Sequence, residues 1–326
     1  MLSRAPSKVV RNWTCDSRHW AGYQPREGDI VIATAPKVGT TWTQRIVSLL
    51  IFQSTDPRPL GPMSPWLDCR FQMPIEVALP MIEAQSHRRF LKSHLPMDAL
   101  PIYDEVRYIH VARDGRDACM SYLNHFNSFV PEAWERIDAV GLADETIAAP
   151  AHRPPTTPRE FFHHWLEDDR DLGSPMMAAK FFDIERSFWA ERARPNLLLV
   201  HYNDLKADLS GEMKRIAAFL DIETPDDLWP QLVEAATFDS MKRDGDALLA
   251  GMERAFRGGH ESFLHKGTNN RWRGEFTDED LRLYQRRVTE AVSPALASWL
   301  ELGRLAAGDP RDTPDQATAD ASGALA

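Results

Sequence analysis

Cysteine is scarce in this chain of 326 residues. Its three cysteines, Cys15, Cys69 and Cys119, are widely spaced and form no CxxC pair. That pattern favours neither a disulfide framework nor a zinc site. It fits a protein of the reducing cytoplasm. We interpret Cys119 as a small buried residue of a helix.

Long apolar runs and excess positive charge are missing as well. No run approaches the roughly 18 apolar residues of a membrane span, and residues 1–20 lack the apolar core of a secretory signal. The formal net charge of −10 disfavours a broad surface for nucleic acid or anionic membranes. A locally basic pocket for a small anion is compatible with that charge.

Short apolar runs alternate with longer helical patterns along the chain. Strands are expected at 29–35, 88–94, 106–113 and 196–202, and helices at 41–52, 116–126, about 203–219 and 281–300. This alternation predicts an α/β fold with a central parallel sheet and helices on both faces. Ligands of such sheets bind at the carboxyl ends of the strands.

A single domain is expected over residues 1–305. Within it, the segment 127–175 is the least regular part and holds a proline-rich loop, so it is either a lid on the acceptor side or a surface excursion without function. His163 and His164 in this segment are adjacent and face different sides of a helix, so they do not form a metal pair. Residues 306–326 are poor in large apolar residues, which predicts a disordered tail.

A buried strand, a glycine turn and a helix follow one another in residues 30–50. Gly39 permits a close backbone approach, and the first free amides of the helix, at Thr40 and Thr41, favour an anion. Lys37 adds a mobile positive charge. The lysine precedes the glycine, so the loop does not match the Walker A pattern. The alternative is a plain strand–turn–helix junction.

Two further stretches carry cations near glycines. Arg113 ends the strand 106–113, where a ligand phosphate would lie, and Ser121 in the next helix offers a hydroxyl donor. The alternatives are a surface ion pair between Arg113 and Asp114, or a Walker B strand with Asp114 as a magnesium ligand. The stretch 263–277 is the third, and its default interpretation is a solvated basic loop.

The segments "APKVGTTW" (35–42), "VARDGRDACMSY" (111–122) and "HKGTNNRWRGEFT" (265–277) resemble, in order and spacing, the signature segments of the cytosolic-type sulfotransferases that use PAPS, 3′-phosphoadenosine 5′-phosphosulfate. The resemblance covers about residues 28–300 and is strongest to bacterial members such as the mycobacterial glycolipid sulfotransferase. It implies a P-loop-type nucleotide-binding fold. It also implies transfer of a sulfonate group from PAPS to a hydroxyl of a small acceptor.

The resemblance also implies which residues hold the donor. The 5′-phosphosulfate would be held by Lys37, Gly39, Thr40 and Thr41. Adenine would be contacted by Trp42, Tyr202, Thr237 and Phe238. The 3′-phosphate would be held by Arg113, Ser121, His265, Lys266 and Gly267.

Several positions depart from the family pattern. His265 stands where the family often has arginine, so one contact to the 3′-phosphate is weaker or depends on pH. Ala236 replaces the first hydroxyl residue of the adenine segment. The residues "TNNRW" replace "xxGDW", and Asn270 lacks the freedom of glycine at positive φ. The dimerisation motif of eukaryotic members is not evident at 273–281, which leaves the oligomeric state open.

The stretch "FLKSHLP" (90–96) resembles the family segment whose histidine is the catalytic base, which indicates His94. A histidine suits that role because its ordinary pKa lies near neutral pH. Lys37 would neutralise the bridging oxygen as it leaves, and Lys92, two residues from His94 along a strand, would steady the sulfonate oxygens. Such in-line transfer depends on positioning and electrostatics. The lysines and helix amides supply the positive field, so no metal is needed.

The acceptor pocket is expected beside His94, walled by 64–74 and 127–175. Its apolar wall is expected to include Trp66, Phe71, Phe126 and Phe129. That wall favours a lipophilic alcohol, phenol or glycolipid over a polar sugar. Two other functions compete with this one: an ATP-dependent kinase that needs magnesium, and a nucleotide-binding protein without catalysis.

Overall fold

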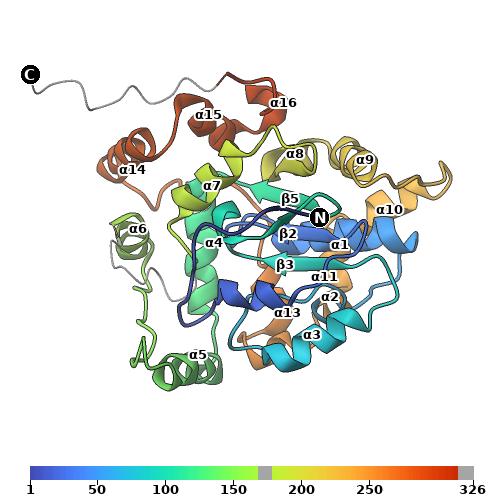
Figure 1. Cartoon of the computed structure of the whole chain (residues 1–326). Helices are drawn as coiled ribbons and strands as arrows, with labels where there is room; N and C mark the ends of the chain where they lie inside the picture. Colours follow the sequence, from blue (N-terminus) through green and yellow to red (C-terminus); the bar gives the residue numbers. More distant parts are fainter. Residues whose placement is uncertain (168–177, 315–326) are drawn as a thin grey trace, which may run out of the picture.

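A four-stranded parallel sheet forms the centre of the computed structural model, which describes residues 1–167 and 178–314. The strands are β2 (Ile30–Ala33), β3 (Phe90–Ser93), β5 (Arg107–Ala112) and β6 (Leu197–His201), in the order β3-β2-β5-β6 (Figure 1). All neighbouring pairs are parallel, and each strand lies inside a predicted range. The chain runs outward from β2 to β3 and from β5 to β6, so the switch point of the sheet lies between β2 and β5.

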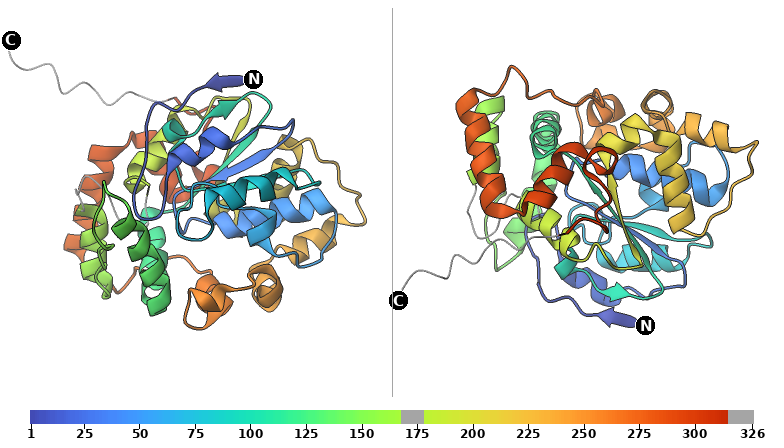
Figure 2. Two further views of the ribbon diagram at one scale, coloured as in Figure 1. Left: turned by 60° about the horizontal axis from the view of Figure 1, so that its bottom comes forward. Right: turned by 90° about the horizontal axis from the view of Figure 1, so that it is seen from above.

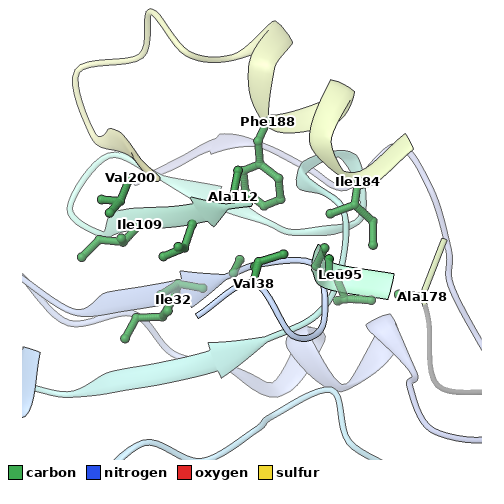
Figure 3. Packing of buried hydrophobic residues seen from close by; sticks show 14 of the residues in the cluster. Ile32, Val38, Leu95, Ile109, Ala112, Ala178, Ile184, Phe188 and Val200 are labelled. Carbon is green, nitrogen blue, oxygen red and sulfur yellow. The ribbon is translucent and has the colours of Figure 1, made fainter. Parts of the chain in front are cut away.

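Helices cover both faces of the sheet, as predicted (Figure 1). Helix α1 (Thr40–Phe52) packs against β2 and β3. Helix α7 (Phe181–Ala190) lies over the sheet, and the ring of Phe188 stacks on that of His110 in β5 with centroids 3.9 Å apart. Figure 3 shows Ile184 and Phe188 of α7 above the strand residues Ile109 and Val200. Strands β2 and β6 are buried along their whole length, which explains their continuous apolar runs.

The other elements surround this sheet. A two-stranded antiparallel sheet joins β1 (Leu2–Arg4) to β4 (Ile102–Tyr103), and three 3₁₀ turns span Ser17–Gly22, Met97–Ala99 and Met252–Arg254. The remaining helices are α2 (Leu60–Met63), α3 (Ile75–Glu83), α4 (Gly115–Asn127), α5 (Pro131–Ala143), α6 (Pro158–Glu167), α8 (Tyr202–Ala207), α9 (Leu209–Phe219), α10 (Trp229–Ala235), α11 (Phe238–Arg243), α12 (Gly245–Leu248), α13 (Gly259–Leu264), α14 (Asp278–Ala291), α15 (Pro294–Leu302) and α16 (Arg304–Ala307). Within the described ranges 1–167 and 178–314, no helix combines the length and apolar character that a membrane crossing needs.

Two of the predicted helices form as single elements and two are split. The predictions for 41–52 and 116–126 match α1 and α4 to within one residue. The predicted helix at 203–219 is divided because Asp208 is not helical and its side chain caps α9 by accepting from the amide of Gly211. The single helix predicted at 281–300 is wrong. Val292 is extended and Pro294 starts α15, because proline does not continue a helix and disfavours the helical conformation before it.

The segment 127–175 contains two helices, α5 and α6, joined by residues 144–157. Helix α6 contacts α4 and α14, and Figure 2 shows α5, α6 and α14 grouped beside the sheet. His163 of α6 lies with Nε2 2.8 Å from Oδ1 of Asp280 in α14, so its side chain has a structural partner. Residues 168–175 of the segment fall outside the described residues.

The ordered chain continues past the predicted domain boundary at residue 305. Nε of Arg192 donates to the carbonyl of Pro310 at 2.9 Å, and Nη2 of Arg311 donates to that of Leu197 at 2.7 Å. The prediction of a tail that is disordered from residue 306 is therefore corrected for 306–314. The rest of that tail, 315–326, lies outside the described residues.

Candidate active site

The loop between β2 and α1 requires its glycine. Gly39 is the N-cap of α1 and has φ 122°, a conformation that side-chain-bearing residues rarely adopt. A Cβ at this position would also lie 3.1 Å from the ring of Tyr202. The hydroxyls of Thr34 and Thr40 are 2.6 Å apart, which ties the end of β2 to the first turn of α1. The free amides of that turn therefore face the switch point, where an anion would be stabilised.

One cavity lies at this end of the sheet and collects most of the predicted site. Thirteen predicted residues line it: Lys37, Gly39, Thr40, Thr41, Trp42, Lys92, His94, Arg113, Ser121, Tyr202, Phe238, His265 and Gly267.

Two predicted donor contacts, Thr237 and Lys266, do not line the cavity. The hydroxyl of Thr237 caps α11, accepting from the amide of Ser240 at 3.2 Å, and donates to the carbonyl of Glu234. The side chain of Lys266 is exposed to solvent. Neighbours of both residues in the sequence, Phe238 and Gly267, do reach the cavity.

His94 is a buried histidine whose tautomer follows from its partner. Its Nδ1 lies 2.8 Å from the carbonyl oxygen of Thr34. A carbonyl only accepts, so Nδ1 carries the proton and the lone pair of Nε2 is available. Burial, followed by the positive charge of Lys92, lowers the pKa of His94 well below its ordinary value. The side chain is therefore a neutral base, held edge to face against Trp66 with ring centroids 4.9 Å apart.

The two lysines of the cavity are close enough to influence each other. Burial and the charges of Lys92 and Arg113 lower the pKa of Lys37 to about 7. Burial also lowers the pKa of Lys92, whose Nζ lies 4.5 Å above the ring of Trp66. Neither ammonium forms an ion pair with a carboxylate in the described part of the chain. Partly buried cations without carboxylate partners among the described residues fit a site for a multiply charged anion.

Aromatic side chains line the cavity beside the loop, and we call this part of it the aromatic slot. The rings of Trp42 and Tyr202 meet edge to face with centroids 5.3 Å apart, and Nε1 of Trp42 donates to the carbonyl of Ala236 at 2.7 Å. Gly267 has φ 61°, and a Cβ there would lie only 2.6 Å from the ring of Phe238. Aromatic side chains of this kind suit a planar ring as ligand.

Arg113 is fixed by the third basic stretch rather than by its neighbour in sequence. Its Nη2 donates to Oδ1 of Asn269 at 2.7 Å and to the carbonyl of Thr268 at 3.0 Å, and its guanidinium lies 4.1 Å above the ring of Tyr202. Its Nε is buried and has no hydrogen-bond partner among the residues described. Asp114 instead caps α4 and pairs with Arg116 at both carboxylate oxygens. Both alternatives for this stretch, an Arg113–Asp114 ion pair and a magnesium-binding Asp114, are therefore disfavoured.

Several residues of the cavity wall were missed as site residues. His125, Phe256, Phe263, Met252 and Arg271 line it. His125 carried a signal, because it lies four residues after Ser121 and so on the same face of α4. The stretch 252–264 has no motif, and it reaches the cavity only because α13 packs against α4 and α11.

The predicted acceptor wall is largely present in the same cavity. Trp66, Phe71 and Phe129 line it, whereas Phe126 lies behind the wall, stacked on Trp134 with centroids 5.5 Å apart. Among the residues described, 1–167 and 178–314, no group of three or more His, Cys, Asp or Glu side chains is arranged to hold a metal ion.

Comparison with known protein families identifies the family of the chain. The sulfotransferase domain matches residues 27–294. The chain belongs to the sulfotransferase family. A glycolipid sulfotransferase of Mycobacterium bovis is 35% identical to it over 311 residues, which cover 91% of this chain and 94% of that protein. Sulfotransferase 1B1 of Mus musculus is 26% identical over 268 residues, covering 78% of this chain and 79% of that one.

A solved structure shares the fold of this sulfotransferase. The crystal structure of retinol dehydratase in complex with androsterone and the inactive cofactor PAP superposes with a TM-score of 0.64 at 21% identity, covering 84% of this chain and 83% of that one. The predicted α/β sulfotransferase fold is thus confirmed. The protein is an enzyme of the sulfotransferase class, so the kinase and the non-catalytic nucleotide-binding protein are not supported as alternatives.

Proposed function

We propose that this sulfotransferase moves the sulfonate group of PAPS to a hydroxyl of a lipophilic acceptor, with His94 as the general base. The observation that carries the proposal is the set of residues in the cavity at the carboxyl ends of the strands. It holds an unprotonated histidine nitrogen, two half-buried lysines without carboxylate partners in the described ranges, and a buried arginine. A donor with anionic groups at both ends of a nucleoside would use the three cations, and the acceptor hydroxyl would use the histidine nitrogen.

The residues fit such a donor. Lys37 and the amides at the start of α1 would bind the 5′ end, and Gly39 permits its close approach to the backbone. The aromatic slot, which includes Trp42 and Phe238, suits the adenine ring. Nε of the buried Arg113 can donate a hydrogen bond but has no acceptor among the described residues, and an oxygen of a 3′-phosphate would provide one.

The proposed chemistry assigns one task to each group near His94. Nε2 of His94 takes the proton of the acceptor hydroxyl as the acceptor oxygen bonds to sulfur. The bond from sulfur to the bridging phosphate oxygen breaks on the opposite side, and Lys37 neutralises the charge that develops on that oxygen. Lys92 steadies the sulfonate oxygens. The products are the sulfated acceptor and 3′-phosphoadenosine 5′-phosphate, with the proton left on His94.

The wall beside His94 supports a lipophilic acceptor. Trp66, Phe71, Phe129, Phe256 and Phe263 all line the cavity, so a polar sugar alone would lose its hydration there without replacing it. Relatives at 35% identity are named glycolipid sulfotransferases. We infer an alcohol, phenol or glycolipid with an apolar body as the acceptor.

The test is a transfer assay with sulfur-labelled PAPS and a panel of phenols, sterols, glycolipids and free sugars. We expect labelled product with lipophilic acceptors, in the presence of EDTA. Parallel reactions contain ATP and magnesium in place of PAPS. Transfer only with ATP would contradict the donor, and a preference for free sugars would contradict the acceptor class.

A further inference from the structure

Arg271 is a cation of the cavity wall whose side chain has no polar partner in the part of the chain that the structure describes. Its side chain is half-buried, lines the cavity together with Arg113 and makes no hydrogen bond and no ion pair with the residues in 1–167 and 178–314. Burial and then the positive charge of Arg113 lower the pKa of Arg271. Two guanidinium groups thus repel each other in one wall. An anion between them would remove that repulsion and accept from both.

The backbone around Arg271 is fixed by the helix that carries Ser121. Oδ1 of Asp117 accepts from the amide of Asn270 at 2.6 Å, and the amide of Arg271 also donates to this carboxylate. Asp117 and Ser121 are four residues apart and share a face of α4. The loop that carries Arg271 is therefore attached beside Ser121, at the end of the cavity where Arg113 lies.

Asn270 makes the tight turn of this loop possible. It has φ 63°, the left-handed conformation for which related sequences use glycine. Asparagine tolerates that conformation better than most residues do. The expected difficulty at Asn270 is thus avoided, and the next residue, Arg271, takes the position at which the family pattern has aspartate.

His265 does not supply a positive charge at the end of the cavity where Arg113 lies. It stands where the family often has arginine, and its buried Nε2 has no hydrogen-bond partner within the described ranges. Burial, followed by the charges of Arg271 and Lys266, lowers the pKa of His265 to about 4, so the side chain is uncharged at neutral pH. Lys266 is exposed and does not line the cavity. Arg113 would be the single full charge for the 3′-phosphate unless another cation contributed.

We propose that Arg271 is the second guanidinium of the 3′-phosphate site and makes up for the arginine that His265 replaces. The inference rests on the proposed donor, PAPS, and adds a residue that determines selectivity for its 3′-phosphate. The two arginines would grip the phosphate from two sides, Arg113 from the end of β5 and Arg271 from the loop, with Ser121 as a hydroxyl donor.

The experiment compares two nucleotides that differ only in the 3′-phosphate, 3′-phosphoadenosine 5′-phosphate and adenosine 5′-phosphate. Their dissociation constants are measured by calorimetry for the wild type, Arg271→Gln and Arg273→Gln. Arg273 is the matched control, because it is an exposed arginine two residues away that does not line the cavity. Arg271→Gln should weaken binding of the bisphosphate about 10- to 100-fold, as for a lost charge-assisted hydrogen bond. It should leave adenosine 5′-phosphate nearly unchanged, and Arg273→Gln should change neither.

The outcomes separate this inference from the proposed function. Suppose that the wild type prefers the bisphosphate. If Arg271→Gln then keeps this preference, or loses affinity for both nucleotides equally, the role of Arg271 is overturned and the proposed donor stands. A wild type that binds the two nucleotides equally would overturn the proposed donor, and this inference with it.

Discussion

The ammonium nitrogen of Lys37 lies 3.4 Å from Nδ1 of His125 and 4.4 Å above the ring centroid of Phe263. An ammonium only donates, so Nδ1 accepts and the proton of the neutral imidazole is on Nε2. Burial, followed by the charge of Lys37, lowers the pKa of His125 well below its ordinary value. Lys37 therefore has a neutral partner in place of a carboxylate, and its own charge is only weakly held near neutral pH.

We expect donor binding to depend on the protonation of Lys37. The pKa of Lys37 is lowered to about 7, so the free enzyme loses this charge as the pH rises through that value. The anionic donor favours the charged form, and binding above pH 7 takes up a proton. Affinity for 3′-phosphoadenosine 5′-phosphate should fall with rising pH, by at most about tenfold per unit. Calorimetry in buffers of different ionisation enthalpy would detect the proton uptake.

Lys37→Arg provides the control for that pH dependence. Arginine stays charged at all these pH values, so the slope of affinity against pH should flatten whatever the absolute affinity of the variant. An unchanged slope would assign the titration to another group, and a wild type without a slope would contradict the lowered pKa of Lys37.

His94→Ala should abolish transfer while leaving nucleotide binding intact. A general base contributes about 10²- to 10⁴-fold to a rate, and the imidazole faces the acceptor hydroxyl in the proposed arrangement. The measurements are turnover with PAPS and calorimetric affinity for 3′-phosphoadenosine 5′-phosphate. His19→Ala is the matched control, because Nδ1 of His19 also pairs with a backbone carbonyl, that of Leu67 at 3.1 Å, but the residue lies outside the cavity. Turnover by His94→Ala at the wild-type rate would refute the assignment.

Gly267→Ala should damage the aromatic slot through a clash. The added methyl group would lie 2.6 Å from the ring of Phe238 at a position with φ 61°, so Phe238 must move. Gly274→Ala is a close control, since Gly274 has φ 84° and open space around it. Both variants carry backbone strain of roughly 1 kcal/mol or more. Only Gly267→Ala should weaken nucleotide binding, and equal affinities for the two variants would contradict the slot.

Local sequence patterns predict those parts of the candidate site that consist of one strand and the turn after it. The glycine turn before α1 and the arginine at the end of β5 follow from chain-local patterns, and both segments fold within a residue or two of the prediction. The sheet then brings them together, because parallel strands have their carboxyl ends at one edge.

The parts that sequence does not predict depend on competition or on tertiary packing. Thr237 was expected at the nucleotide, but a helix N-cap uses its hydroxyl. Phe263 reaches the cavity through packing of α13, and Phe256 lies beside Phe129, with which it forms a β-bridge; neither contact leaves a local pattern. Pro294 is a sequence signal for a helix boundary, but the apolar pattern continues on both sides of it and suggests one uninterrupted helix.

Stability should depend strongly on the buried pair of Asp29 and Arg89, at the amino ends of β2 and β3. Nε of Arg89 lies 2.9 Å from Oδ1 of Asp29, and the two side chains are 2% and 1% exposed. Asp29→Asn would remove the buried counter-charge and leave the guanidinium only the partly exposed carboxylate of Glu83, 2.9 Å from Nη1, so the cost should be as much as about 3–5 kcal/mol. That is a large part of the roughly 5–15 kcal/mol by which a folded protein is stable.

Urea unfolding followed by circular dichroism would measure this loss. Asp221→Asn is the control, because the pair of Arg107 and Asp221 has a similar nitrogen–oxygen distance of 2.9 Å but its carboxylate is 75% exposed, so its loss should cost less than about 1 kcal/mol. Equal free energies of unfolding for the two variants would show that burial does not increase the contribution of the Asp29–Arg89 pair to stability. The folded fraction of Asp29→Asn should still bind nucleotide normally, because the pair lies at the end of the strands opposite the cavity.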